Sequence, residues 1–179
     1  MKKILLLLMV SFLVVSLKAQ MLVPVDAASS VKFTIKNFGL KVDGFMKGLQ
    51  GKIIFNPSNL ATASFAVSAD AATINTNNGT RDTHLKKEEY FDVAKHQRLQ
   101  FTSTKIAATN NPAVFKIEGN ITIKGVTKWL SFPFTVVEKP EGYMFLGEFT
   151  INRRDFKVGG NSLVLSDNLI VSLSVFAKK

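Results

Sequence analysis

The sequence contains no cysteine among its 179 residues. Disulfide bonds, thiolate metal ligands, cysteine nucleophiles and a cysteine-linked lipid anchor are therefore excluded. The folded chain must be stabilised by side-chain packing and backbone hydrogen bonds instead.

Histidine is almost as scarce, with only His84 and His96. A zinc site is disfavoured, because no histidine pair has the usual spacing of about three to five residues. Asp82, His84 and one of the serines are the elements of a hydrolase triad, but no serine lies in a Gly-x-Ser-x-Gly turn. A phosphate-binding glycine loop and a dinucleotide fingerprint are also missing. A hydrolase using Asp82 and His84 stays open only as an alternative.

Long apolar runs are confined to the start of the chain. Lys2 and Lys3 precede an apolar run from Ile4 to Leu17, and the small residue Ala19 follows. The run is shorter than the roughly 20 residues of a membrane-spanning helix, and the pattern is typical of a secretory signal peptide. We predict a signal peptide over residues 1–19 and a single domain over residues 20–179, exported to the periplasm or, alternatively, to the extracellular medium.

Acidic residues are few: 13 Asp and Glu stand against 23 Lys and Arg, which gives a formal net charge of +10. The lysines are scattered singly, whereas a nucleic-acid footprint concentrates charge on one stripe or helix. We therefore expect no nucleic-acid partner. Peripheral contact with an anionic membrane surface is compatible with this charge.

A helical period is missing from most of the chain after Val25, and apolar and polar residues alternate instead. Such alternation is the pattern of half-buried strands, and Gly, Pro and Asn clusters between the segments indicate turns. Eight short-spaced strands favour an all-β, eight-stranded antiparallel barrel over a sandwich. The alternating segments are residues 31–38, 48–55, 63–74, 99–106, 114–125, 128–137, 143–151 and 168–176.

An outer-membrane barrel would show the same alternation with the polar side facing inward. Lys32, Lys36 and Lys116 would then line a narrow lumen with too few carboxylates to pair with them. We therefore expect the apolar side to face the interior.

Phenylalanine is abundant, with 15 copies, most of them in the expected strands. A packed core accounts for any one of them, but together they could line a pocket for a long apolar ligand. The inward parity of each strand, which a slip of one residue would reverse, predicts the cavity-lining residues. These are Val31, Phe33, Ile35, Phe45, Phe65, Val67, Phe101, Phe115, Ile117, Ile121, Phe132, Phe134, Phe149 and Leu173.

The stretch NNGTRDTHLKKEEYFDV, residues 77–93, interrupts the strand pattern. It begins with turn-forming residues, Asp82 suits a helix N-cap, and Leu85, Tyr90 and Phe91 supply an apolar side. We predict a short helical insert around residues 80–92 that covers an end or edge of the barrel.

Four motifs make the chain resemble the YceI-like family of bacterial exported lipid-binding proteins, also described as polyisoprenoid-binding. They are SSVKFTIKNFGLKVDGFMKGLQGKIIFNP, INTNNGTRDTHLKKEEYFDVAKHQRLQFTST, IEGNITIKGVTKWLSFPF and FTINRRDFKVGG. The chain departs from the family in HQR at residues 96–98, where relatives commonly have a tyrosine or proline, and at Lys157, where a glycine is usual. These departures affect the barrel mouth and hence the preferred head group.

The resemblance implies a lipocalin-like barrel with an elongated apolar tunnel and no general catalytic activity. It also recasts the insert as a recurring structural element, in which Arg81, Asp82 and His84 fix the connection while Tyr90 and Phe91 pack it down. The structural motif that it marks comprises Arg81, Asp82, His84, Leu85, Tyr90, Phe91 and Asp92.

We therefore expect a carrier or sequestering protein that holds an amphipathic lipid for transport, storage or stress protection. The implied ligand is an isoprenoid chain, an isoprenoid quinone or a fatty-acid-like molecule, with no catalytic residue, no metal and no required cofactor. Besides the hydrolase, a barrel filled by its own side chains that acts through its surface stays open as an alternative. The oligomeric state is not set by the sequence, a homodimer being one option.

Overall fold

The structure, a computed structural model, describes residues 20–179. The signal peptide predicted over residues 1–19 lies outside these residues. The elements follow in this order: β1 (Met21–Pro24), η1 (Asp26–Ala28), β2 (Ser30–Asn37), β3 (Leu40–Ile54), η2 (Leu60–Thr62), β4 (Ser64–Asn75), α1 (Gly79–Leu85), β5 (Arg98–Ala108), β6 (Val114–Ile123), β7 (Val126–Lys139), β8 (Gly142–Asn152), η3 (Arg153–Phe156) and β9 (Leu165–Lys178).

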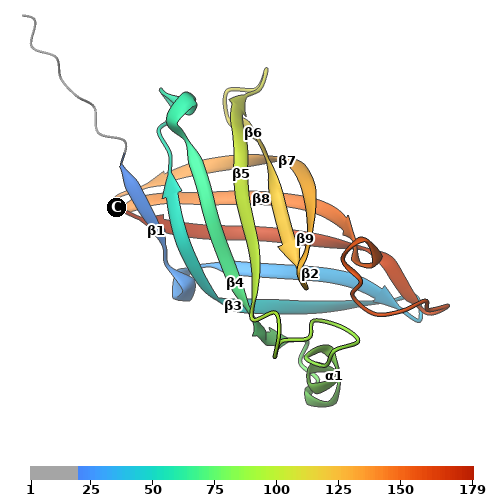
Figure 1. Ribbon diagram of the computed structural model, residues 1–179. Coiled ribbons are helices and arrows are strands. Elements are labelled where there is room, and N and C mark those ends of the chain that lie inside the picture. Colours follow the sequence, from blue (N-terminus) through green and yellow to red (C-terminus); the bar gives the residue numbers. More distant parts are fainter. Residues whose placement is uncertain (1–19) are drawn as a thin grey trace, which may run out of the picture.

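Eight long strands close into a barrel. Neighbouring strands follow the order β3-β2-β9-β8-β7-β6-β5-β4, and β4 returns to pair antiparallel with β3. The short β1 is an additional strand that pairs with the ends of β3 and β9. Figure 1 shows the strands winding around the barrel, with α1 below the end of β4 and the C-terminus at the far left. The predicted eight-stranded antiparallel barrel is confirmed.

Alternation along the strands separates the interior from the surface, as β6 illustrates. Ile117, Ile121 and Ile123 are buried, while Lys116 and Asn120, each directly before one of them, are exposed. Successive side chains of a strand point to opposite faces, so one face of each strand supplies the barrel interior.

The inward parity of β3 differs from the prediction, and Phe45 is the residue affected. Gly44 pairs with Phe33 and takes the inward position, whereas Phe45 pairs with Lys32 on the outer face. A Cβ at Gly44 would overlap the Phe33 ring, so the missing side chain makes room for that ring. The assignment of Phe45 to the interior is therefore wrong, because an inward glycine carries no apolar signal in a sequence pattern.

The connections between strands alternate between the two ends of the barrel. The β2–β3, β4–β5, β6–β7 and β8–β9 connections lie at one end, called the open end below, and the β3–β4, β5–β6 and β7–β8 connections lie at the other. The β4–β5 connection contains α1, whose seven residues make it shorter than the predicted insert. Turns complete that segment. None of the helices among residues 20–179 is long and apolar enough to span a membrane.

Candidate ligand-binding cavity

A cavity of about 770 Å³ occupies the barrel interior. Inward side chains from all eight long strands form its wall, and residues of α1 and of the β8–β9 connection complete it at the open end. Most of the wall is aliphatic or aromatic, and the polar lining residues belong mainly to the open end. The volume lies within the range of about 300–1,000 Å³ that is typical of small-molecule sites.

Phenylalanine rings close the far end of this cavity. The ring of Phe55, directly after β3, lies 5.4 Å from Phe115, 5.4 Å from Phe145 and 5.8 Å from Tyr143, all edge-on. Edge-to-face pairs of this kind are favourable beyond the area that they bury. The cluster seals the barrel interior at the end opposite α1.

All but two of the apolar residues predicted from strand parity lie on the cavity wall. These are Val31, Phe33, Ile35, Phe65, Val67, Phe101, Ile117, Ile121, Phe132, Phe134, Phe149 and Leu173. The two exceptions are Phe45, which is on the outer face, and Phe115. Phe115 faces inward but lies beyond the cavity, where its ring packs 5.4 Å from Phe55 and 5.5 Å from Phe134.

Other lining residues were missed by the parity list. Met46 and Leu49 lie on opposite parities of β3, because register shifts against β4 fall between Phe45 and Lys47 and between Lys47 and Gln50. Leu99 and Phe145 extend the alternation of β5 and β8. The alternation itself was the signal for Leu99 and Phe145. The β3 residues required knowledge of the bulge, which changes the parity partway along the strand.

Asp82 anchors the start of the α1 segment, but not as its N-cap. Asn78 is the cap residue, and its side chain accepts a hydrogen bond from the Arg81 N–H at 3.0 Å. Asp82 Oδ1 instead accepts hydrogen bonds from the backbone N–H of Thr76 at 2.9 Å and from its hydroxyl. Arg81 donates from Nε to the Thr76 hydroxyl at 2.7 Å and from Nη2 to the Thr76 carbonyl at 2.8 Å. Arg81 and Asp82 thus hold α1 against the end of β4.

His84 does not take part in this network. Its side chain is exposed and lines the open end of the cavity, and no hydrogen bond joins it to the other residues of 20–179. The expectation that His84 fixes the connection is therefore not met. Asp82, committed to Thr76, forms no dyad with His84 within the described chain.

The remaining motif residues divide between the turn and the cavity. Leu85, Tyr90 and Phe91 are partly buried, pack against the core and line the cavity. Asp92 is buried, and its carbonyl accepts a hydrogen bond from the His96 N–H at 2.8 Å, which closes the turn after α1.

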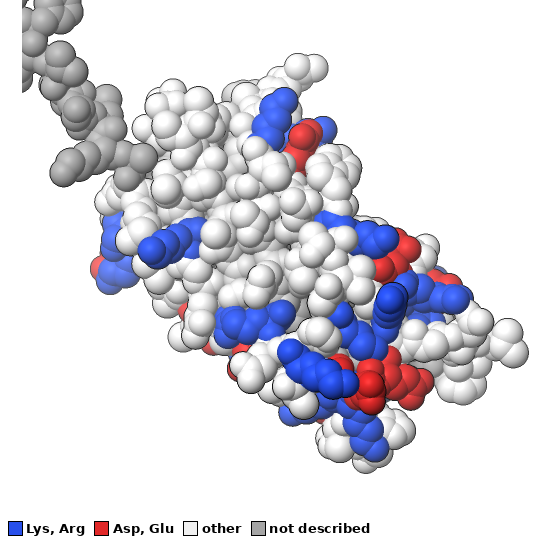
Figure 2. All heavy atoms as spheres, in the orientation of Figure 1, with Lys and Arg blue, Asp and Glu red and all other residues white. Residues whose placement is uncertain are grey.

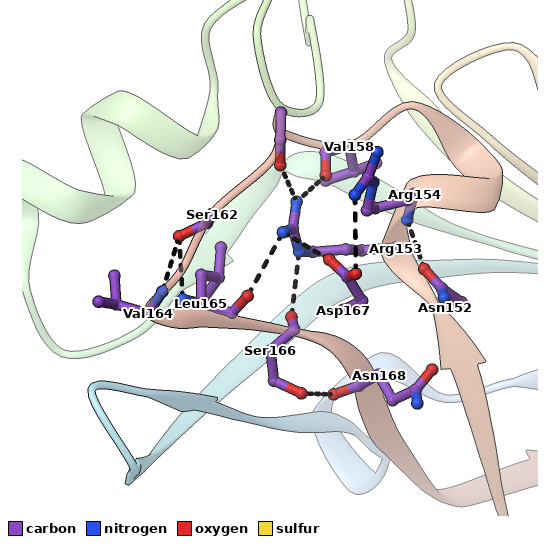
Figure 3. Close-up of polar contacts among 11 residues, drawn as sticks. Asn152, Arg153, Arg154, Val158, Ser162, Val164, Leu165, Ser166, Asp167 and Asn168 are labelled. Carbon is purple, nitrogen blue, oxygen red and sulfur yellow. Dashed lines mark hydrogen bonds and ion pairs between the residues drawn. The ribbon is translucent and has the colours of Figure 1, made fainter.

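Arg153 organises the opposite side of the open end. This arginine is only 4% exposed, and each of its N–H groups faces an acceptor in the β8–β9 connection or at the start of β9 (Figure 3). Its acceptors are the carbonyls of Val158, Gly160, Leu165 and Ser166 at 2.9–3.4 Å and the Asp167 carboxylate at 2.8 Å. The sequence pattern did not single out this residue, although it lies in the FTINRRDFKVGG motif.

The two sides of the open end also contact each other. The Gly159 N–H donates to the Glu89 carbonyl at 2.9 Å, and Lys124 Nζ donates to the carbonyls of Glu89 at 3.0 Å and Lys157 at 2.8 Å. A Cβ at Gly159 would lie 2.9 Å from the Tyr90 ring, so the close approach requires glycine. The rim, defined as residues 76–91 together with residues 153–165, is therefore a hydrogen-bonded frame around the entrance.

An ion pair lies on the outer face of β2 and β3. Lys32 Nζ lies 2.8 Å from Asp43 Oδ2, and the Thr34 hydroxyl donates to Asp43 Oδ1 at 2.6 Å. The hydrogen bond from Lys32, followed by that from Thr34, lowers the pKa of the Asp43 carboxyl from its ordinary value of 3.8. Among residues 20–179 no group of three or more His, Asp or Glu side chains gathers in a way that could hold a metal ion.

Comparisons with known proteins cover almost the whole described chain. A family model described as a YceI-like domain matches residues 24–177. A UPF0312 protein of Pectobacterium atrosepticum is 29% identical over 135 residues, covering 72% of this chain and 69% of that protein. A UPF0312 protein of Pseudomonas fluorescens is 31% identical over 137 residues, covering 70% of this chain and 69% of its own.

Solved structures share the fold. BcnA of Burkholderia cenocepacia superposes with a TM-score of 0.81 at 21% identity, covering 87% of this chain and 99% of that one. The YCEI protein of Campylobacter jejuni superposes with a TM-score of 0.68 at 27% identity, covering 77% of this chain and 85% of that one. A domain of Saccharophagus degradans, described as a polyisoprenoid binding domain, superposes with a TM-score of 0.71 at 14% identity, covering 90% of this chain and 99% of that one.

Proposed function

The chain belongs to the YceI-like family, and we propose that its barrel binds an amphipathic lipid with the apolar tail inside the cavity and the polar head at the rim. The observation that carries this proposal is the apolar cavity of about 770 Å³, closed by phenylalanine rings at one end and framed by polar groups at the other. A ligand with one apolar and one polar end matches this gradient.

The hydrophobic effect supplies enough free energy for such binding without specific polar contacts. Each methylene removed from water contributes about 0.8 kcal/mol, so roughly ten buried methylenes contribute about 8 kcal/mol before the costs of association. Recognition of this kind depends on length and width more than on the chemistry of the tail. An isoprenoid chain, an isoprenoid quinone and a fatty-acid-like molecule are therefore all candidates.

Family membership supports a binding role over a catalytic one. The neighbour from Saccharophagus degradans is described as a polyisoprenoid binding domain, and the Asp82 carboxylate, which a hydrolase would need, is committed to Thr76. The cavity volume also argues against a barrel filled by its own side chains. We propose transport, storage or protective sequestration of the lipid in the periplasm or outside the cell.

Native mass spectrometry of the purified protein tests this proposal. We expect an added mass on the protein that solvent extraction removes and that lipid analysis identifies as an isoprenoid, a quinone or a fatty-acid-like molecule. A protein that carries no lipid and also fails to take up ubiquinone, isoprenols and fatty acids after extraction would refute it.

A further inference from the structure

Large apolar side chains are exposed together at the open end of the barrel. Phe38 is 73% exposed, Leu40 is 72% exposed, Leu163 is fully exposed, and Val164 is partly exposed. The Phe38 N–H donates to the Val164 carbonyl at 2.9 Å, which joins the β2–β3 turn to the β8–β9 connection. We call these four residues the mouth tip. In Figure 2 the end of the molecule at the right, where β2 ends in Figure 1, is mostly uncharged, with charged side chains behind it.

Phe38 is costly for the fold at its position. The two residues of the β2–β3 turn, Phe38 and Gly39, have φ values of +51° and +75°. Turns of this kind favour Asn or Asp before glycine, because a bulky side chain is strained at positive φ. An aromatic residue that is both strained and exposed does not serve folding, which points to a role outside the fold.

The mouth tip is continuous with the cavity. Val164 and Leu165 line the cavity, and Leu165 pairs with Asn37 next to the β2–β3 turn. An apolar molecule leaving the cavity past the β8–β9 connection therefore meets the mouth tip rather than a polar surface.

Positive charge flanks the mouth tip. Lys36, two residues before Phe38, and Lys41, one residue after Leu40, are cross-strand partners. Both are exposed, and no ion pair joins either to another described residue. Acidic groups near this end include Asp155, which is exposed on η3, and Asp167, whose carboxylate contacts Arg153 at 2.8 Å and Arg154 at 3.8 Å. Asp43 on β3 is paired with Lys32 at 2.8 Å, and Glu88 and Glu89 are exposed in the segment after α1.

The charge of the whole described chain has the same sign. The formal charge is +10 for all 179 residues, and it is +7 for residues 20–179, because Lys2, Lys3 and Lys18 precede residue 20. Lysines behind an apolar tip match the phosphate level of an anionic bilayer while the apolar side chains reach the acyl boundary.

We propose that the mouth tip docks on an anionic lipid bilayer and turns the cavity entrance toward the membrane. Phe38, Leu40 and Leu163 insert at the interface, and Lys36 and Lys41 contact lipid phosphates. This inference rests on the proposed lipid-binding function and specifies where the protein meets the source or destination of its ligand. An exposed apolar patch at the entrance of a lipid cavity lets a chain cross without passing through water.

Flotation with lipid vesicles tests the docking surface. We expect the protein to float with vesicles of equimolar phosphatidylcholine and phosphatidylglycerol, and less with pure phosphatidylcholine. Phe38→Asn with Leu163→Ser should weaken this partitioning roughly tenfold or more, and Asn suits the positive φ at position 38, so folding is preserved. The matched control is Val137→Thr, which changes a 41% exposed residue of β7 toward the closed end and should leave flotation unchanged.

Two double substitutions test the contribution of the lysines that flank the mouth tip. Lys36→Gln with Lys41→Gln should remove the preference for phosphatidylglycerol, whereas Lys139→Gln with Lys179→Gln, at the closed end, should retain it. Salt should weaken wild-type flotation, because screening acts on the exposed lysines.

Binding of decylubiquinone in solution separates this inference from the proposed function. The mouth-tip variant should bind the quinone as the wild type does, since neither substituted residue lines the cavity. Unchanged flotation of the mouth-tip variant would overturn the docking surface. The mouth tip would instead be a dimer interface if the wild type were a dimer, and if the substitutions dissociated it without changing flotation. Failure of the wild type to bind decylubiquinone, isoprenols and fatty acids, with flotation behaving as expected, would overturn the lipid-carrier function instead.

Discussion

At Lys157 the backbone has a φ of +56°, in the left-handed region, directly after η3. Glycine adopts this conformation without the steric cost that a Cβ imposes. The hydrogen bonds of Lys157 are made by its backbone: its N–H donates to the Arg154 carbonyl at 3.0 Å, and its carbonyl accepts from Lys124 Nζ at 2.8 Å.

Replacement of Lys157 by glycine should therefore stabilise the protein. We expect Lys157→Gly to raise the free energy of unfolding by about 0.5–1 kcal/mol, measured by urea denaturation. Lys157→Ala is the control, because it removes the same side chain and keeps the Cβ. Equal effects of the two substitutions would show that the lysine side chain, and not the backbone, sets the stability at this position.

Asp82 and His84 should differ sharply in what their removal costs. Asp82→Ala leaves the buried Thr76 without its acceptor, so we expect the free energy of unfolding to fall by about 1–3 kcal/mol. Asp82→Asn keeps an oxygen acceptor, so its loss should be smaller. His84→Ala, at an exposed side chain with no hydrogen bond in the described chain, should change it by less than about 0.5 kcal/mol. A large destabilisation by His84→Ala would restore the structural role expected from the sequence.

Ionisation of Asp43 should make the stability of the fold depend on pH, with lower stability at low pH. Its folded-state pKa is lowered by Lys32 and then by Thr34, so the ion pair stabilises the fold above the ordinary carboxyl value of 3.8. This contribution is lost as the pH falls through the lower folded-state pKa. NMR titration should show the Asp43 midpoint below 3.8, and Lys32→Met should raise it toward that value. An unchanged midpoint in Lys32→Met would assign the shift to another group.

At the scale of elements, parity along each strand explains both the correct and the wrong site assignments. The regular alternation of β6 predicts the inward Ile117 and Ile121, which the structure places on the cavity wall. On β3 the alternation conceals an inward glycine and a register shift between Phe45 and Lys47. A pattern that reads only apolar side chains cannot detect an inward residue without one, so Phe45 was misplaced.

The pairing of Gly44 with Phe33 should appear as an energetic coupling between β2 and β3. Gly44→Ala would push its Cβ into the Phe33 ring, and we expect a cost of about 1–2 kcal/mol in the free energy of unfolding. In a Phe33→Ala background the same substitution should be neutral or stabilising, which a double-mutant cycle by urea denaturation would measure. Equal costs in both backgrounds would contradict the packing of the Phe33 ring over Gly44.

At the scale of the molecule, the barrel was predictable from alternation and turn residues, but the hollow interior was not. Alternation identifies which side chains face inward, whereas the free volume depends on how closely they approach across the barrel. The same is true of the rim. Arg153 and Gly159 act through backbone carbonyls and close contacts of distant segments, which leave no periodic signal in the sequence.

The most direct measurement of the central proposal is the affinity for decylubiquinone of two variants on neighbouring residues of β9. Leu173 lines the cavity, whereas the Ser172 hydroxyl donates to Glu148 on the exposed face at 2.8 Å. We expect Leu173→Trp to fill the cavity and weaken binding roughly tenfold or more, while Ser172→Trp binds as the wild type does. Equal affinities of Leu173→Trp and Ser172→Trp would contradict binding in the barrel interior.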